Sequence, residues 1–223
     1  MSYFRSCAKR IHDWLFQNSV YTVRYGYFRG FKLRGRMPWF QRDVGESRDT
    51  AEMQFFETLS LHQKVFYDIG SHQGPHTFLC HRLIGRGGYV YAFEPDPVSS
   101  DILKKRIELN SLKDVDVIPF GLGDQPGQFT LVVPDSNQMQ MAATLSENLK
   151  ESLSEDQVLS TIKVDVVRLD DWINENSPQD PDLIKIDVEG FEVQVLKGSV
   201  EVLSRANPLL FIEIHGADQI SKT

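Results

Sequence analysis

From residue 65 onward the chain alternates between short apolar runs and longer amphipathic segments. Short, continuously apolar strands separated by helices are typical of a mostly parallel sheet with helices on both faces. This pattern predicts an α/β fold. The expected strands are Val65 to Ile69, Tyr89 to Phe93, Val115 to Phe120, Leu183 to Ile186 and Leu209 to Ile214, and the expected helices are Pro75 to Ile84, Val98 to Leu109 (with Val98, Ile102 and Ile107 inside) and Phe191 to Leu203.

One region interrupts this rhythm between the third and fourth strands. Phe129 to Val133 predicts one arm of a hairpin, and the alternating stretch Ile162 to Val167 predicts a half-exposed strand. A polar segment from about residue 135 to residue 160 separates them. Long segments of this kind are often functional, so we interpret this one, with Met139, Met141 and Thr144, as a lid over a binding site.

The front of the chain has a different pattern. Residues 3–16 have the apolar spacing of a short amphipathic helix. Residues 20–41 combine alternation with glycines, which indicates either strands and turns or a basic arm. A helix is expected from about Thr50 to Leu59, burying Met53 and Phe56, with Phe55 as a further candidate for the core. We therefore divide the chain into an N-terminal appendage, residues 1–49, and a main domain, residues 50–223.

Composition excludes the disordered and fibrous classes, since 41% of the 223 residues are hydrophobic and 25% are charged. The net charge of −7 conceals an asymmetry: residues 1–42 hold nine basic residues and one acid, and the remainder carries a net −15. No apolar stretch is long enough to span a membrane, and the N-terminus lacks the pattern of a signal peptide. Cys7 and Cys80 have no metal-like or redox-like spacing, so a cytoplasmic chain is expected.

The basic front end, residues 1–42, admits three interpretations. It caps the main domain through its aromatic residues; or Trp14, Leu15 and Phe16, with their basic neighbours, bind a membrane surface peripherally; or the segment binds an acidic glycan. Nucleic acid is disfavoured as a partner because the main domain's charge of −15 would repel a phosphate backbone.

Candidate ligand-binding residues follow the first three expected strands, where the carboxyl ends of an open α/β sheet form a crevice. Asp68, Gly70 and Gly74 follow the first strand, Glu94 ends the second, and Gly123 and Asp124 follow the third. An acid at the second position accepts ribose hydroxyls, and Asp124 would accept the adenine amino group. Asp68 would repel a pyrophosphate but not an ammonium or a sulfonium. Taken singly, Asp68 could be a helix cap and Glu94 a surface acid, but together they favour an adenosine ligand without phosphates.

A longer motif points to a known family. The block Leu183-Ile184-Lys185-Ile186-Asp187-Val188-Glu189-Gly190-Phe191-Glu192, supported by Tyr67 to Gly70, Phe93 to Pro95, Leu169 to Asp171 and Phe211 to His215, resembles the FkbM family of S-adenosylmethionine-dependent methyltransferases. The resemblance covers residues 52–215. It implies a class I methyltransferase sheet, bound S-adenosylmethionine and methyl transfer to a hydroxyl of a sugar, glycolipid or secondary metabolite.

This chain departs from the family pattern at two places. Ser71 and His72 stand where members commonly carry Ala-Asn, so the loop that would contact the donor differs. The sequence also ends eight residues after His215, which leaves no room for the antiparallel hairpin that normally completes a class I sheet. We therefore expect the C-terminal antiparallel strands to be missing.

The expected catalytic residues lie at the last two strands. Asp187 would orient the acceptor or the donor, with Glu189 beside it, and His215 would be the general base because an ordinary imidazole titrates near neutral pH. Two alternatives remain open. One is that His215 is a surface residue without a catalytic role. The other is that Asp187, Glu189 and Glu213 hold a divalent cation such as magnesium. Glu189 and Glu192 would equally suit the start of a helix, where acids complement the helix dipole.

Three function classes remain at this point. The leading one is an O-methyltransferase acting on a small-molecule or glycan acceptor. A non-catalytic module that keeps the S-adenosylmethionine fold for binding or assembly is the second. A nicotinamide-dependent oxidoreductase is the third, and Asp68 in place of the first glycine of the dinucleotide motif argues against it.

Overall fold

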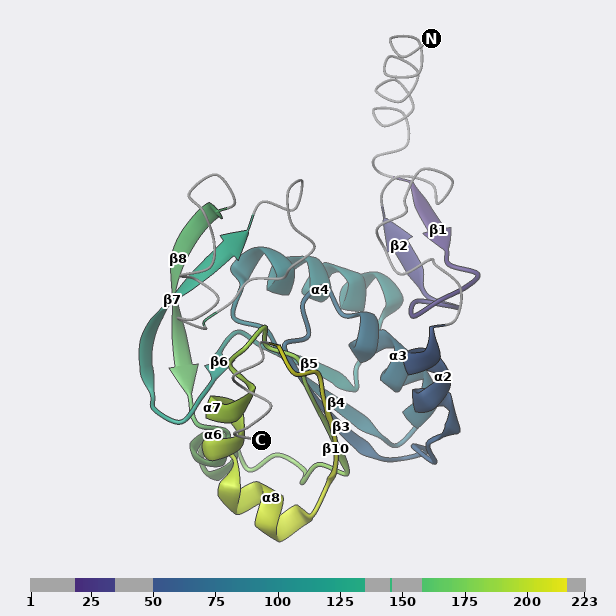
Figure 1. Cartoon of the computed structure of the whole chain (residues 1–223). Helices are drawn as coiled ribbons and strands as arrows, with labels where there is room; N and C mark the ends of the chain where they lie inside the picture. Colours follow the sequence, from purple (N-terminus) through teal and green to yellow (C-terminus); the bar gives the residue numbers. More distant parts are fainter. Residues whose placement is uncertain (1–18, 35–49, 135–144, 146–157, 216–223) are drawn as a thin grey trace, which may run out of the picture.

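Five parallel strands form the central sheet of the computed structural model, which describes residues 19–34, 50–134, 145 and 158–215 (Figure 1). The chain moves outward from the middle strand in one direction, then returns and moves outward in the other. Ligands of open α/β sheets bind where this reversal occurs, which here lies between β3 and β9. The spatial order is β10 (Leu209–Ile212), β9 (Leu183–Ile186), β3 (Val65–Ile69), β4 (Tyr89–Phe93) and β5 (Val115–Ile118).

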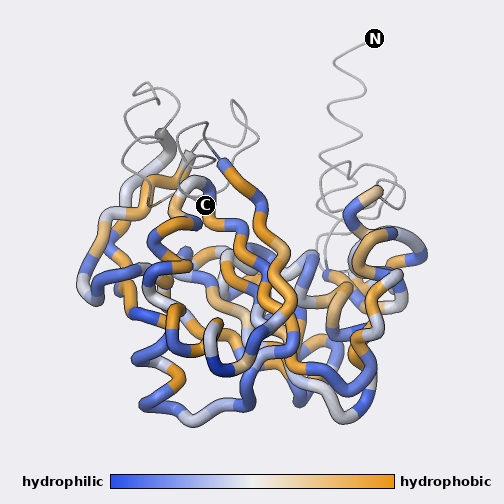
Figure 2. The backbone as a smooth tube through the Cα atoms, turned by 60° about the horizontal axis from the view of Figure 1, so that its bottom comes forward, coloured by the Kyte–Doolittle hydropathy of each residue, from blue (hydrophilic) through white to orange (hydrophobic). Residues whose placement is uncertain are grey.

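Neighbouring residues of β3 belong to different hydrophobic cores. Phe66 packs with Phe78 in one core, and Tyr67 packs with Trp172 in the other. Because side chains alternate between the faces of a strand, each core covers one face of the sheet. Figure 2 shows the hydrophobic colour concentrated where the strands cross the interior. One face carries α2 (Ala51–Thr58), α3 (Pro75–Ile84) and α4 (Pro97–Asn110), and the other carries α6 (Leu169–Asn176), α7 (Glu192–Lys197) and α8 (Val200–Ala206).

A second sheet of three strands lies beside the carboxyl ends of the central one. It contains β6 (Gly121–Leu122), β8 (Val158–Val167) and β7 (Gly127–Pro134), with β7 and β8 antiparallel. This confirms the hairpin expected from the alternating segments. Leu145, from the segment between β7 and β8, is buried against this sheet beside Leu131 and Val166. The rest of the polar segment between these strands, with the lid assigned to it, falls outside the described residues.

A two-stranded hairpin of the front end packs against the main domain. It is formed by β1 (Val20–Thr22) and β2 (Lys32–Arg34), which confirms the strands and turn expected in this region as far as residue 34. Residues 35–41 of that prediction fall outside the described residues. Phe28 is buried beside Phe78, with ring centroids 5.1 Å apart, and the Arg106 guanidinium lies 5.0 Å from the Phe28 ring centroid. The expected helix at residues 3–16 falls outside the described residues.

The structure corrects three details of the predicted helices. The predicted helix from Phe191 to Leu203 is two helices, because the Asp170 carboxylate accepts hydrogen bonds from the backbone N–H groups of Glu201 and Val202 and so caps a new amino end. In α4, Val98 is 65% exposed rather than internal, and in α2, Phe55 is 43% exposed rather than part of the core. The buried positions of α4 are Ser99, Ser100, Leu103 and Ile107.

Four elements begin and end at the residues that the sequence predicts: the helix α3 and the strands β3, β4 and β9. The sequence does not predict the helix α6. Among the described residues, no strand pairs with the outer side of β10. Within the same residues, no helix combines the length and apolar character needed to cross a bilayer.

Replacing Gly198 by alanine is expected to lower the free energy of unfolding by about 1–3 kcal/mol. The added Cβ would lie 1.9 Å from the carbonyl oxygen of Gly123, so the joint between α7 and α8 would have to move. Urea denaturation measures the change. Ser204→Ala, at an exposed position of α8, is the control and should change the stability by less than about 0.5 kcal/mol. Equal stability of the Gly198 variant and the wild type would contradict this description of the joint.

Candidate active site

A cavity of about 490 Å³ opens at the carboxyl ends of β3, β4 and β9. Its lining includes Ser71 and His72 from the loop after β3, Glu94 from the end of β4, and Asp187 and Glu189 from the segment after β9. Leu131 and Ile162 of the smaller sheet form part of an apolar wall. The cavity therefore lies at the strand-order reversal and joins an apolar side to a charged side.

Gly70 fits the cavity loop for a steric reason. Its φ is +77°, and a Cβ at this position would lie 1.8 Å from the carbonyl oxygen of Asp187. The ends of β3 and β9 therefore touch only because residue 70 has no side chain. Gly74 also has a positive φ, but a Cβ there would meet Leu103 of α4, and Gly74 does not line the cavity. We predicted close approach to a ligand at Gly74, and the structure instead shows close packing against a helix.

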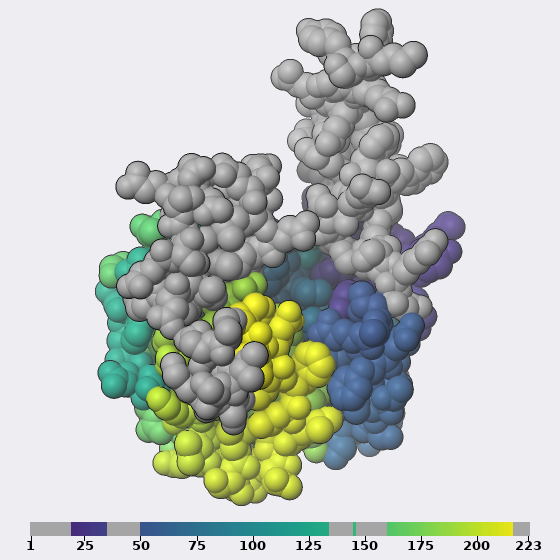
Figure 3. Space-filling view, viewed as in Figure 1, coloured from purple at the N-terminus to yellow at the C-terminus, as the bar shows by residue number. Residues whose placement is uncertain are grey.

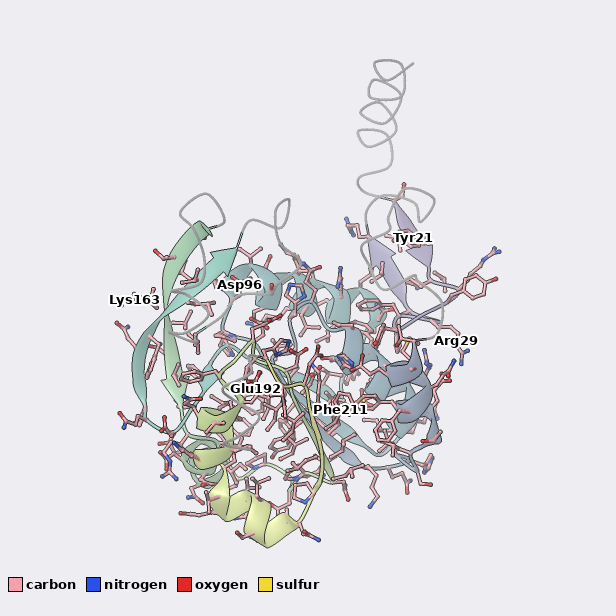
Figure 4. All side chains as sticks on the ribbon, viewed as in Figure 1. Tyr21, Arg29, Asp96, Lys163, Glu192 and Phe211 are labelled. Atoms are coloured by element: carbon pink, nitrogen blue, oxygen red, sulfur yellow. The ribbon has the colours of Figure 1, made fainter. Side chains whose placement is uncertain are left out.

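Glu94 is a buried carboxylate at the rim of the cavity. One of its oxygens accepts a hydrogen bond from the backbone N–H of His72 at 2.6 Å, and the other accepts from that of Asp96 at 2.8 Å. Figure 4 shows Asp96 at the amino end of α4. Burial raises the pKa of Glu94 to about 7, against the lowering effect of these two hydrogen bonds, with Asp96 and Asp68 adding to the increase. Burial lowers the pKa of His72, which favours a neutral ring.

The two residues predicted after the third strand lie away from the cavity. Gly123 and Asp124 do not line it, and the carbonyl oxygen of Gly123 faces Gly198 instead. The wall at this position is formed by Phe120, Gly121 and Leu122. An acceptor for an adenine amino group at Asp124 therefore has no support from this geometry.

Lys185 is the functional candidate that the residue pattern left without a role. Its side chain is 2% exposed, and Nζ lies 3.0 Å from Asp187 Oδ2 and 3.8 Å from Asp68 Oδ1. Burial alone would lower the pKa of Lys185, but the two carboxylates outweigh burial and raise it, so the ammonium stays charged. The sequence contains a signal for this pairing: a lysine within the otherwise apolar β9 is expected to be buried, and a buried lysine needs an oppositely charged partner.

Asp68 is fully buried behind the cavity loop rather than on the cavity surface. Its Oδ2 accepts a hydrogen bond from Thr77 at 2.5 Å, and its Oδ1 faces Lys185. Asp68 therefore reaches the cavity through Lys185. Ser71, by contrast, lines the cavity, and its buried Oγ has no hydrogen-bond partner among the described residues.

His215 lies among the carboxylates of Asp187, Glu189, Glu192 and Glu213. We call these five residues the His215 cluster. His215 Nδ1 lies 3.1 Å from Glu192 Oε1, and Nε2 lies 3.6 Å from Glu189 and Glu213 and 3.9 Å from Asp187. The hydrogen bond to Glu192 is the main cause that raises the pKa of His215 to about 9. The imidazole is therefore mostly protonated at neutral pH, whereas the sequence predicts a base with an ordinary pKa.

The cluster also has the composition of a metal-binding site. One ligand atom each from Asp187, Glu213 and His215 lie within 4.8 Å of one another. Glu189, which we had grouped with Asp187 and Glu213, is not part of this set. Glu192 accepts from the backbone N–H of Gly190 at 2.9 Å, so it also stabilises the start of α7.

A second polar network, which the sequence did not reveal, connects the front end to the cavity. Tyr27 donates a hydrogen bond to Glu52 at 2.6 Å, and Glu52 lies 2.8 Å from His76 Nε2. His76 lines the cavity. Although burial raises the pKa of Glu52, its hydrogen bond with His76 is the largest opposing effect, and together with the remaining interactions it lowers the pKa to about 2. The carboxylate therefore stays charged and holds the His76 ring in place.

The structure combines a parallel sheet, covered by helices on both faces, with a polar cavity at the strand-order reversal. The chain belongs to the family described as the methyltransferase FkbM domain, which matches residues 68–221. Family membership confirms the resemblance found in the sequence.

Two curated relatives are similar over most of the chain. The hexuronic acid methyltransferase AglP of Haloferax volcanii is 24% identical, covering 92% of this chain and 81% of the relative. The 2-O-methyltransferase NoeI of Sinorhizobium fredii is 27% identical, covering 74% and 68%. Among solved structures, the methyltransferase FkbM of Methylobacillus flagellatus is 21% identical with a TM-score of 0.48, and the match covers 70% of this chain and 34% of that one.

Replacing Lys185 by methionine is expected to lower the free energy of unfolding by about 3–5 kcal/mol, because it leaves the buried carboxylate of Asp68 uncompensated beside Asp187. Adding Asp68→Asn should recover part of the loss. Urea denaturation of the single and double variants measures both effects. The control is Lys64→Met, whose exposed pair with Asp182 should contribute no more than about 1 kcal/mol. Equal losses in Lys185→Met and Lys64→Met would show that burial of this pair is not important.

Proposed function

We propose that this chain transfers a methyl group from S-adenosylmethionine to a hydroxyl oxygen of a sugar or a related small molecule. The observation that carries the proposal is the position of Asp187, which lines the cavity at the strand-order reversal and belongs to the His215 cluster. Two relatives are named as a hexuronic acid methyltransferase and a 2-O-methyltransferase, and these names support an oxygen acceptor on a sugar.

The donor side of the cavity suits S-adenosylmethionine. Each oxygen of Glu94 already accepts one backbone N–H and retains a lone pair, so both can accept a ribose hydroxyl. The apolar wall of Phe120 and Leu122 suits the adenine ring. Ser71, with its unpartnered buried Oγ, and the neighbouring His72 would hold the methionine portion. Asp68 does not line the cavity and contributes indirectly, because its carboxylate pairs with Lys185 and so holds Lys185 in place.

Asp187 has one carboxylate oxygen on each side of the site. Oδ2 faces Lys185, whereas Oδ1 faces the His215 ring. When bound, S-adenosylmethionine supplies an electrophilic methyl group. The protein has to hold the acceptor oxygen in line with it and to accept the proton that the hydroxyl loses, for which the carboxylate of Asp187 at the cavity wall is suited. Positioning of this kind can lower a barrier by about 7–11 kcal/mol. We assign this positioning to Asp187, with Glu189 at the same wall.

The first test separates donor binding from methyl transfer. The wild type should bind S-adenosylhomocysteine in calorimetry and should transfer a labelled methyl group to at least one member of a panel of hexoses, hexuronic acids and their glycosides. Asp187→Asn should lower kcat by about 100-fold or more while changing the dissociation constant of S-adenosylhomocysteine by less than about threefold. Asp171→Asn, on α6 with a side chain that is 46% exposed, is the matched control.

The outcomes of this test are distinct. Full activity of Asp187→Asn would remove Asp187 from the mechanism. Binding of S-adenosylhomocysteine without turnover across the whole panel would favour a non-catalytic binding module. Tight binding of NAD with no binding of S-adenosylhomocysteine would contradict the proposal as a whole.

The second test uses the raised pKa of Glu94. Ionised Glu94 accepts hydroxyl donors better than its protonated form, and its pKa is raised to about 7, so donor affinity should be lost as the pH falls through 7. Between pH 8 and pH 6 the affinity for S-adenosylhomocysteine should fall about tenfold. Calorimetry at several pH values measures this. Glu94→Gln should bind more weakly and with no pH dependence, whereas His72→Asn should keep the slope. A slope that persists in Glu94→Gln would show that another group titrates.

A further inference from the structure

The carboxyl ends of β9 and β10 bring three side chains of different chemistry to one point. Ligand atoms of Asp187, Glu213 and His215 lie within 4.8 Å of one another, although the sequence separates the first from the other two by more than twenty residues. Two carboxylates and an imidazole at this separation form a suitable ligand set for a divalent metal ion. We propose that these three residues bind a divalent cation of the manganese or magnesium type.

The orientation of the His215 ring gives a second, independent reason. Nδ1 of the ring lies 3.1 Å from Glu192 Oε1, which leaves Nε2 facing Asp187 and Glu213. Histidine ligands of metals nearly always direct their other ring nitrogen at a carboxylate or carbonyl, which fixes the ring. Glu192 is completely buried, and its Oε2 has no hydrogen-bond partner in the described part of the chain. A buried carboxylate in this position is expected behind a metal ligand and is costly otherwise. Figure 4 places Glu192 at the amino end of α7.

Asp187 is held in a way that leaves one oxygen for a cation. Lys185 Nζ contacts Oδ2 at 3.0 Å, and Oδ1 is on the side of the imidazole. The ammonium therefore fixes the carboxylate without occupying the oxygen that faces the cluster. The Glu213 side chain is 51% exposed, so an ion can reach the site from solvent.

Charge favours a divalent ion at this point. Four carboxylates surround the ring, and Lys185 is the one lysine or arginine that contacts them among the ion pairs of the described residues. A metal ion that binds Nε2 displaces the proton from the imidazole. The cluster with a neutral imidazole, together with Lys185, then carries a net charge of about −3, which a divalent ion reduces to about −1. Carboxylate oxygens favour manganese and magnesium, and the single imidazole makes manganese a suitable probe.

This inference rests on the proposed function in one respect, the role of the ion. A cation on Asp187 would lie at the cavity wall and would bind the acceptor hydroxyl, which lowers the pKa of that hydroxyl. His215 would then be a metal ligand and not a general base. This assignment agrees with its position among acids rather than beside an open part of the cavity.

The test is a titration of the full-length chain with manganese alone, followed by electron paramagnetic resonance of the free ion. The wild type should show one saturable site. Glu213→Gln and His215→Gln should weaken binding at least about tenfold, and Glu192→Gln, which changes only the group behind the ring, should weaken it about 10–100-fold. Glu201→Gln, an exposed acid on α8, should leave binding unchanged. Thermal unfolding of each variant shows whether it is folded, and Glu213→Gln, at an exposed position, keeps the test valid if Glu192→Gln is not.

The result that overturns the inference is a wild type without saturable manganese binding, or binding that is the same in Glu213→Gln and Glu201→Gln. Calorimetry with S-adenosylhomocysteine in the same samples distinguishes this failure from a failure of the proposed function. Donor binding and methyl transfer that survive a chelator would reject the role of the ion in the reaction and leave the proposed function standing. Manganese binding that depends on Glu213, without any methyl transfer, would support the metal site and reject the acceptor chemistry.

Discussion

The arrangement of the site depends on one buried ion-paired group, the ammonium of Lys185 between the carboxylates of Asp68 and Asp187. Asp68 is on β3 and the other two residues are on or directly after β9, so the group joins the two strands at which the sheet reverses its order. Lys185 and Asp68 are both buried, and each would be costly to bury without an oppositely charged partner. The partly exposed Asp187 adds a second carboxylate to the ammonium. The contact of Gly70 with the Asp187 carbonyl brings the same strand ends together sterically. The polar site therefore has a fixed geometry before any ligand binds.

From this group the polar contacts extend in two directions. In one direction, the carboxylate of Asp187 faces the ring of His215, and the buried Glu192 at the start of α7 fixes that ring. On the other side of the sheet, Glu52 and Tyr27 hold His76 at the cavity, so the N-terminal hairpin and α2 contribute to the site. In Figure 3 the blue surface of α2 lies beside the yellow surface of β10, where the rings of Phe56 and Phe211 are 4.9 Å apart. The front end is thus packed into the same body as the site, through residues 19–34.

The elements that could be predicted are those whose signal is local. Strands β3, β4 and β9 are apolar at every position or nearly so, and Pro75 marks the start of α3, so their bounds agree with the prediction. The break between α7 and α8 could not be predicted in this way, because Asp170, which caps the second helix, is about thirty residues away. Glu94 could be placed at the cavity from its position at a strand end. Asp124 follows a strand in a similar way, yet lies outside the lining, where Phe120, Gly121 and Leu122 form the wall instead.

The sequence by itself determined the α/β architecture, the edge of the sheet where the site lies and the family, because burial periodicity, glycine turns and the Lys185 to Glu192 motif are all contained in short stretches of chain. Only the tertiary structure decided what those residues do to one another. The charge of His215 depends on Glu192 and on acids from another strand end, and the pairing of Lys185 with Asp68 depends on strand register. Such interactions fall steeply with distance, and the distances between residues far apart in sequence exist only once the sheet has formed.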